Sequence, residues 1–186
     1  MADKKKKDSS TRGNASQFFI AGELCRRGYS AVVTLGNTPN VDILCSNLDG
    51  TRFAHIQVKT FVPSHEGKKS KTTCSVGMKA TKPFGESFFW VLGGIPKPTD
   101  TVPFVYYVIP SEIMATNVNE AHKMWLADEG KDGHVRQEST VRTVAIPPHK
   151  SYSGWDISEF KNRWDLIEKH LNEEPPNTDS PATDAA

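Results

Sequence analysis

The chain has 186 residues, with 23 Lys and Arg against 22 Asp and Glu, which gives a formal net charge of +1. This length suits a single domain of roughly 100–200 residues, and the near-neutral balance excludes a histone-like, strongly basic protein. Its three cysteines are too widely spaced for a CxxC pair, which favours a reducing compartment over a disulfide framework. No apolar run approaches the ~18 residues that cross a bilayer. The N-terminus also lacks the apolar segment of a secretory signal. We therefore expect a cytoplasmic protein with no membrane partner.

Charge is distributed unevenly along the chain. Residues 1–12 contain a run of four lysines and no apolar periodicity, so they are predicted to form a disordered basic tail. Such a run either keeps the protein soluble or holds phosphates. Residues 172–186 are rich in Pro, Ser, Thr and Ala, carry only acidic charges, and are predicted to form a disordered acidic tail. The folded domain is therefore expected to span residues 13–171.

Within that domain, a helix is predicted first and a series of strands follows. The helix spans 14–28, with Asn14 or Ser16 as its N-cap and Gly28 at its end. Runs of β-branched and aromatic residues predict strands at 29–35, 41–45, 52–60, 87–92, 103–109 and 141–146. Further helices are predicted at 111–114, at 121–127 and from 156 to 171. This order of elements indicates an α+β or mixed α/β fold.

The last predicted helix carries an apolar stripe of Phe160, Trp164, Ile167 and Leu171. Trp155 and Trp164 are expected to close this helix onto the sheet. The aromatic runs 88–90 and 106–107 suit either core packing or stacking on nucleic-acid bases, and their apolar surroundings favour the core.

The turn between the strands at 41–45 and 52–60 sets which residues lie opposite each other. If Asp49 and Gly50 form a two-residue type I′ turn, Asp42 lies opposite Gln57, and directly paired residues point to one face. Lys59 lies two residues beyond Gln57 and therefore on the same face. A bulge or a longer turn would change this register.

An Asp, a Gln and a Lys on one sheet surface suit metal-assisted hydrolysis of a phosphodiester. The Asp42 carboxylate, the Gln57 amide and the Val58 carbonyl offer oxygen ligands of the kind that Mg²⁺ prefers. The Lys59 ammonium would position water or offset the charge of a phosphate. The alternative is a buried Asp42–Lys59 ion pair that only stabilises the sheet.

The segment from Gly13 to Thr60 resembles the core of the PD-(D/E)XK nuclease superfamily. In that family, a helix ending in Gly is followed by a strand with an Asp and then by a (D/E)-x-K strand. Here the Asp corresponds to Asp42, and Gln57, Val58 and Lys59 form a QxK variant of the second motif. The resemblance extends over about residues 13–171. It implies an α/β (α+β) fold with a restriction-endonuclease-like core, which is a mixed central β-sheet flanked by helices.

The sequence departs from the family pattern at two acidic positions. Gln57 replaces the Asp or Glu of the (D/E)-x-K strand, and Gln17 stands where relatives often carry a Glu early in the first helix. Glu23 projects from another face of that helix and is expected to pair with Arg26 or Arg27. Gln17 and His55 are expected to lie next to the metal-binding residues and support them. The alternative for His55 is an ordinary role in packing or hydrogen bonding.

A lysine-rich segment directly follows the proposed catalytic strand. Residues 65–82 contain Lys68, Lys69, Lys71, Lys79 and Lys82 against a single acidic residue. These cations would hold the phosphates that flank a scissile bond, whereas the alternative is a flexible, solvated loop.

The sequence therefore predicts an endonuclease-like protein that uses Mg²⁺ or Mn²⁺ to hydrolyse DNA. Asp42, Gln57 and Lys59 are the expected catalytic residues, and Asp42, Gln57 and Val58 are the expected metal ligands. The alternative function is a catalytically weak or inactive module of the same fold that binds nucleic acid or another partner. A homodimer is a further expectation from the resemblance, because many double-strand cutters with this fold act in pairs.

Overall fold

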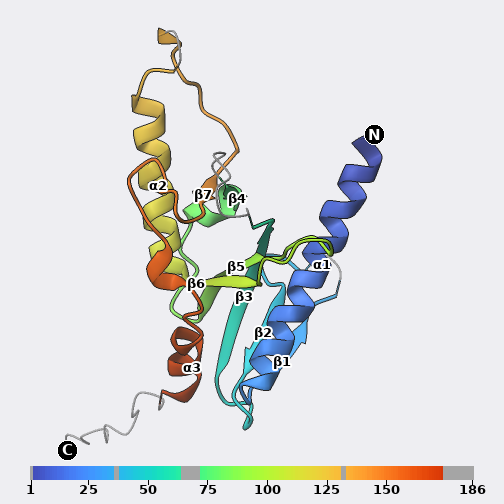
Figure 1. Ribbon diagram of the computed structural model, residues 1–186. Coiled ribbons are helices and arrows are strands. Elements are labelled where there is room, and N and C mark those ends of the chain that lie inside the picture. The colour runs from blue at the N-terminus through green and yellow to red at the C-terminus, as the bar shows by residue number, and fades with distance from the viewer. Residues whose placement is uncertain (1, 36–37, 64–71, 131–132, 174–186) are drawn as a thin grey trace, which may run out of the picture.

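A computed structural model describes residues 2–35, 38–63, 72–130 and 133–173 (Figure 1). Its main helices are α1 (Ala2–Arg26), α2 (Ser111–Ala127) and α3 (Asp165–Asn172). Short 3-10 helices η1 (Met78–Thr81) and η3 (Ser158–Phe160) accompany them. The strands are β1 (Ser30–Val33), β2 (Ile43–Ser46), β3 (Phe53–Phe61), β4 (Thr73–Ser75), β5 (Phe88–Gly94), β6 (Val105–Pro110) and β7 (Thr143–Ala145).

The five long strands form one mixed sheet in the order β1-β2-β3-β5-β6. Strands β3 and β5 are parallel, and the other neighbours are antiparallel. Strands β4 and β7 form a separate two-stranded sheet. This arrangement confirms the predicted α/β class with a mixed central sheet flanked by helices.

The two faces of the large sheet bury two separate hydrophobic clusters. On one face, α1 and α3 cover the alternate residues Ile56 and Val58 of β3, together with Phe89 and Val91 of β5. On the other face, the β4–β7 sheet, α2 and η3 cover Phe61 of β3 and the remaining alternate residues of β5. Both faces of β5 are therefore buried, as expected of a central strand with a continuous apolar run. The aromatic run 88–90 belongs to this core and not to a base-stacking surface.

Helix α1 begins earlier than the sequence predicted. It starts at Ala2, so residues 2–12, predicted as a tail, continue the helix, and neither Asn14 nor Ser16 caps it. Lys and Ala are good helix formers, and extending a helix that is already packed avoids the cost of nucleation. The predicted end is close to the observed one. Gly28 has a φ of 93°, and the Tyr29 N–H donates to the Leu24 carbonyl, which closes the helix with a Schellman motif.

Other predictions differ from the structure in the second half of the chain. Strand β4 was not predicted, and the two short helices predicted at 111–114 and 121–127 are one continuous helix, α2. The residues between them have low helix propensity, but Ala115 and Val118 are buried, and their packing outweighs that propensity.

The predicted last helix is broken into η3 and α3. Asn162 adopts a φ of 54°, and its N–H donates to the Tyr106 carbonyl, which interrupts the helix. As a result, the predicted apolar stripe is divided between the two faces of the sheet: Phe160 joins the α2 side, and Trp164 joins the α1 side.

All three cysteines are free, as the sequence predicted. Burial raises the pKa of the Cys45 and Cys74 thiols to about 12. No helix within the described ranges is long and apolar enough to span a membrane.

Glu23 pairs with both Arg26 and Arg27, as the sequence predicted, and Arg27 extends this group of charges to α3. Its carboxylate accepts hydrogen bonds from Arg26 (Nε, 2.7 Å) and Arg27 (Nε, 2.8 Å), and Arg27 also donates to Glu168 at 2.8 Å. The hydrogen bond from Arg26 is the main reason that the pKa of Glu23 falls from 4.5 to about 2, and Arg27 contributes as well. The ionised form is therefore favoured in the folded state.

A pH-dependent contribution of Glu23 to stability follows. Because its pKa is lower in the folded than in the unfolded chain, its stabilisation is present above pH 4.5 and is lost as the pH falls towards 2. We expect Glu23→Gln to lower the free energy of unfolding by about 1 kcal/mol at pH 7, the size typical of an exposed network. Urea titrations of both proteins at pH 7 and near pH 2 measure this difference. A difference of the same size at both pH values would contradict the assignment.

Candidate functional site

The hairpin of β2 and β3 has the predicted register. Ile43 pairs with Ile56 and Leu44 with His55, which places Asp42 beside Gln57 at the open end of the hairpin. The Asp42 N–H donates to the Ile56 carbonyl at 2.9 Å, so the backbone bonding is offset by one residue just beyond β2, and Asp42 contacts Gln57 through its side chain.

The turn that produces this register is not the predicted one. Asp49 does not have the positive φ that a type I′ turn requires, whereas Gly50 has a φ of 67°. Asn47 instead closes a longer loop: its N–H donates to the Arg52 carbonyl, and its Oδ1 accepts the Thr51 and Arg52 N–H groups. This loop adds one residue on each side of the predicted turn, so the pairing of the strands is unchanged.

The Asp42 carboxylate is held by donors from β3. Its Oδ2 accepts hydrogen bonds from the Gln57 side-chain Nε2 and from the Val58 N–H, the latter at 2.7 Å. Gln57 is buried, with 7% of its surface exposed. Because its amide nitrogen donates to Asp42, its Oε1 is left to accept from another group. Asp42 Oδ1 makes no hydrogen bond with the described residues.

The backbone N–H of Val58 has a role that the sequence did not indicate. The β2–β3 ladder stops at the Ile43–Ile56 pair, so Val58 has no backbone partner on this edge among the described residues, and its N–H donates to the Asp42 side chain instead. The N–H and C=O of one strand residue point to the same edge. The Val58 carbonyl therefore points to the side of β3 on which Asp42 lies.

Lys59 lies on the face of β3 that carries Gln57, since the two are separated by one residue of a strand. Its Nζ lies 6.0 Å from the ring centroid of Trp90, which is in register with Gln57 on the parallel strand β5. No ion pair between Asp42 and Lys59 occurs in the described part of the chain, so the alternative of a purely structural Asp–Lys pair lacks its central contact.

The two residues predicted to support the site, Gln17 and His55, make no hydrogen bond to Asp42, Gln57 or Lys59 within the described part of the chain. His55 shares the Gln57 face and lies 3.5 Å from the Ser87 hydroxyl through Nδ1, which is the ordinary packing role weighed for it. Gln17 is half-buried on α1, and that helix covers the opposite face of β3. It makes no hydrogen bond to the described residues, so its supporting role stays a prediction.

The structure describes two of the five lysines predicted to bind nucleic acid. Lys79 and Lys82 lie in or next to η1 with exposed side chains, in keeping with either a phosphate contact or a solvated surface. Lys68, Lys69 and Lys71 lie outside the described residues.

The oxygen atoms around Asp42 fit a hard divalent cation. Asp42 Oδ1, Gln57 Oε1 and the Val58 carbonyl make no hydrogen bond with the described residues, and all three are ligand types that Mg²⁺ uses. Asn40, two residues before Asp42, has an unpaired buried Oδ1 and an unusual φ of 67°. Within the described ranges, no group of three or more His, Cys, Asp or Glu side chains is arranged for metal binding. Beyond the Asp42 carboxylate, any cation here would therefore depend on amide and carbonyl oxygens and on water.

No protein-family model and no curated protein sequence match this chain. Among solved structures, it is similar to a bacterial homing endonuclease, I-Ssp6803I, with 14% sequence identity and a TM-score of 0.49. The alignment covers 87% of this chain and 92% of that chain.

Proposed function

We propose that the protein is a metal-dependent endonuclease of the PD-(D/E)XK type that acts on DNA, with Asp42 and the QxK strand as its centre. The observation that carries this proposal is the contact of Asp42 with Gln57 and Val58 at the open end of the hairpin. It brings the two separate parts of the sequence motif together, with Lys59 on the same face.

Each residue has a distinct part in this proposal. Asp42 would bind Mg²⁺ or Mn²⁺ through its unpaired oxygen, and the Gln57 and Val58 carbonyl oxygens would complete the protein ligands. The cation would supply Lewis-acid polarisation of the scissile phosphate. The Lys59 ammonium would hold the attacking water or offset charge on the phosphate. The hydrogen bond from the Gln57 amide would fix the carboxylate before substrate binds.

A cleavage assay tests this function. Supercoiled plasmid is incubated with the protein and Mg²⁺ or Mn²⁺, with EDTA as the matched control. We expect nicking or linearisation that requires the metal and that falls in Lys59→Met, which keeps the stem over Trp90 but removes the charge. Cleavage that persists in EDTA, or that Lys59→Met leaves unchanged, would contradict the proposal.

The second candidate function is binding of nucleic acid without cleavage. Asp42 is the single carboxylate in the set around it, and a Gln at position 57 attracts a cation less strongly than a carboxylate. This function predicts DNA binding that weakens with added salt and no cleavage with either metal. A filter-binding titration on the same plasmid, run beside the cleavage assay, distinguishes the two.

A further inference from the structure

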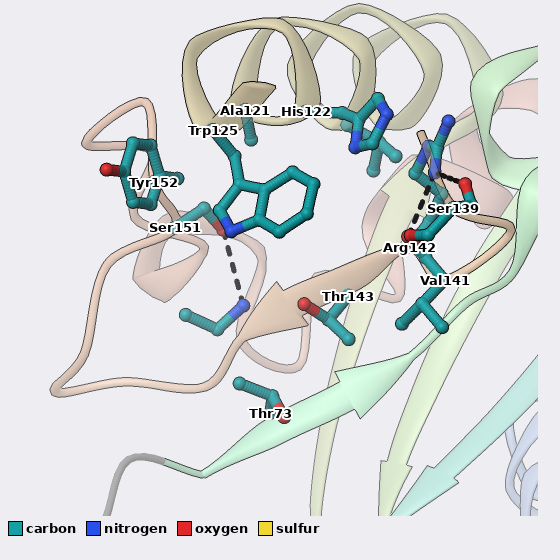
Figure 2. Close-up of a pocket in the computed structure, with 12 residues that line it drawn as sticks. Thr73, Ala121, His122, Trp125, Ser139, Val141, Arg142, Thr143, Ser151 and Tyr152 are labelled. Carbon is teal, nitrogen blue, oxygen red and sulfur yellow. Dashed lines mark hydrogen bonds between the residues drawn. The ribbon is translucent and has the colours of Figure 1, made fainter. Parts of the chain in front are cut away.

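A cavity of about 280 Å³ lies between the second half of α2 and β7 (Figure 2). Neither Asp42 nor Gln57 nor Lys59 lines it, so it is separate from the proposed nuclease site. Figure 2 shows Trp125 and Tyr152 at one end of the cavity and His122, Ser139 and Arg142 at the other.

Arg142 provides a buried positive charge at the polar end. Only 6% of its surface is exposed, although a charged side chain is costly to bury without partners. Its guanidinium donates to the carbonyls of Ser139 (2.6 Å) and Val141 (2.9 Å) and to Glu138 (2.9 Å). Its Nε is buried without any hydrogen-bond partner in the described part of the chain. One donor of this buried cation is therefore unsatisfied within the described part of the chain.

Three donors at this end converge on a single oxygen atom. Glu138 Oε1 lies 2.8 Å from His122 Nε2 and 2.9 Å from the Arg142 guanidinium, and it also accepts the Ser139 N–H at 3.2 Å. The Glu138 side chain itself is 64% exposed, whereas those of His122 and Arg142 are 12% and 6% exposed. The carboxylate of an exposed side chain, Glu138, thus accepts hydrogen bonds from His122 and Arg142, whose side chains are largely buried.

The other end of the cavity is aromatic and apolar. The Trp125 ring stacks against His122 with a centroid distance of 5.6 Å, and the Arg136 guanidinium lies 5.2 Å from the rings of both Trp125 and Tyr152. Arg136 is itself paired with Asp128 and with backbone carbonyls, so it fixes the aromatic rings in place. Ala121 and Ala145 line the space between the ends.

We infer that this cavity binds a small organic monocarboxylate with an aromatic or aliphatic body. The ligand's carboxylate would replace that of Glu138 on His122, Ser139 and Arg142, and its body would lie against Trp125 and Tyr152. Glu138 occupies the site in the absence of ligand and swings out when the ligand binds.

The charge at the polar end favours a carboxylate over a phosphate ester. Among the described residues at this end of the cavity, Arg142 is the permanently charged one, and a buried charge left without a compensating partner is costly. A monocarboxylate balances Arg142 once Glu138 has left, whereas the dianion of a phosphate monoester exceeds it.

Calorimetric titration with three probes tests this inference. We expect phenylacetate to bind with a stoichiometry of one and the neutral isostere phenylacetamide to bind at least about tenfold more weakly, since hydrogen bonds to charged groups are the stronger ones. Equal binding of the acid and the amide, or tighter binding of phenyl phosphate, would contradict the assignment. Absence of phenylacetate binding to wild type and to Glu138→Ala would overturn it.

Glu138 competes with the ligand and is exposed, so it can be replaced without altering the core. Glu138→Ala should bind phenylacetate about tenfold more tightly than wild type, because no internal carboxylate has to be displaced. Glu120→Ala, at an exposed position of α2, is the matched control and should leave the affinity unchanged. Arg142→Gln should lose phenylacetate binding while circular dichroism confirms its fold. Unchanged affinity in Glu138→Ala would overturn the proposed displacement.

Discussion

Asp42→Asn is expected to lower metal-dependent DNA cleavage by at least roughly 100-fold. Mutation of residues that only hydrogen-bond to a metal ligand already lowers activity or metal affinity by about 10–100-fold, and Asp42 is itself the proposed ligand. The substitution removes the charge that would attract the cation but keeps an oxygen that can accept the N–H groups of Gln57 and Val58. Stability should therefore change by no more than about 1 kcal/mol, the typical net value of one hydrogen bond. Initial rates of plasmid nicking, measured beside urea denaturation, separate these two effects.

Asp49→Asn provides the matched control for this prediction. Asp49 is an exposed carboxylate in the loop of the same hairpin, at the end remote from Asp42, and its replacement removes an equal charge. We expect this variant to cleave at the wild-type rate. Equal rates for Asp42→Asn and Asp49→Asn would show that Asp42 has no part in the chemistry.

Trp164→Ala is expected to lower the free energy of unfolding by about 3–5 kcal/mol, the usual cost of truncating a buried aromatic side chain. Trp164 is 2% exposed, lies 5.3 Å from the Tyr106 ring, and packs in the cluster beneath Ile56 and Val58. A small domain has only about 5–15 kcal/mol of stability in total. This substitution therefore weakens the packing beneath β3, the strand that carries Gln57 and Lys59.

A second tryptophan tests whether burial causes this loss. Trp155 is half-buried at the edge of the cluster on the other face and contacts Phe160 edge-on at 6.4 Å. Trp155→Ala removes the same type of side chain from a half-buried position. In a urea titration it should lower the free energy of unfolding by clearly less than Trp164→Ala does. An equal or larger loss in Trp155→Ala would contradict the assignment of Trp164 as the main contact of α3 with the sheet.

The sequence was sufficient to predict that Asp42 and Gln57 lie beside each other, but not the turn that brings them together or the contact of Asp42 with the Val58 N–H. The pairing of Asp42 with Gln57 was predicted from an assumed two-residue turn at Asp49 and Gly50, and the register of a hairpin is a local property. The turn type was wrong, yet the register survived because Asn47 and Arg52 lengthen the loop equally on both sides. A loop longer by one residue on one side alone would have separated Asp42 from the Gln57 face.

Long-range contacts could not be predicted in the same way. The proximity of Lys59 to Trp90 depends on the parallel register of β3 and β5, which no local pattern specifies. Strand β4 has three residues and is completed by β7, about 70 residues later. The sequence did not indicate Arg142 either, because its charge is buried only once α2 packs beside β7.

The course of the last helix illustrates a different difficulty. Phe160 and Trp164 have the spacing of one helical stripe, but Asn162 takes up a left-handed conformation between them. Asn adopts such conformations more readily than most residues do. The spacing of Phe160 and Trp164 did not show whether Asn162 lies on the surface of a continuous helix or breaks the helix.

A crystal structure of the protein with Mn²⁺, examined by anomalous scattering, tests the central claim most directly. The account predicts a single strong anomalous peak that Asp42 Oδ1 and Gln57 Oε1 contact directly, with the Gln57 amide nitrogen still donating to Asp42. A Mn²⁺ peak that excludes Asp42, or no peak at this end of the hairpin in crystals of protein that cleaves DNA, would contradict it.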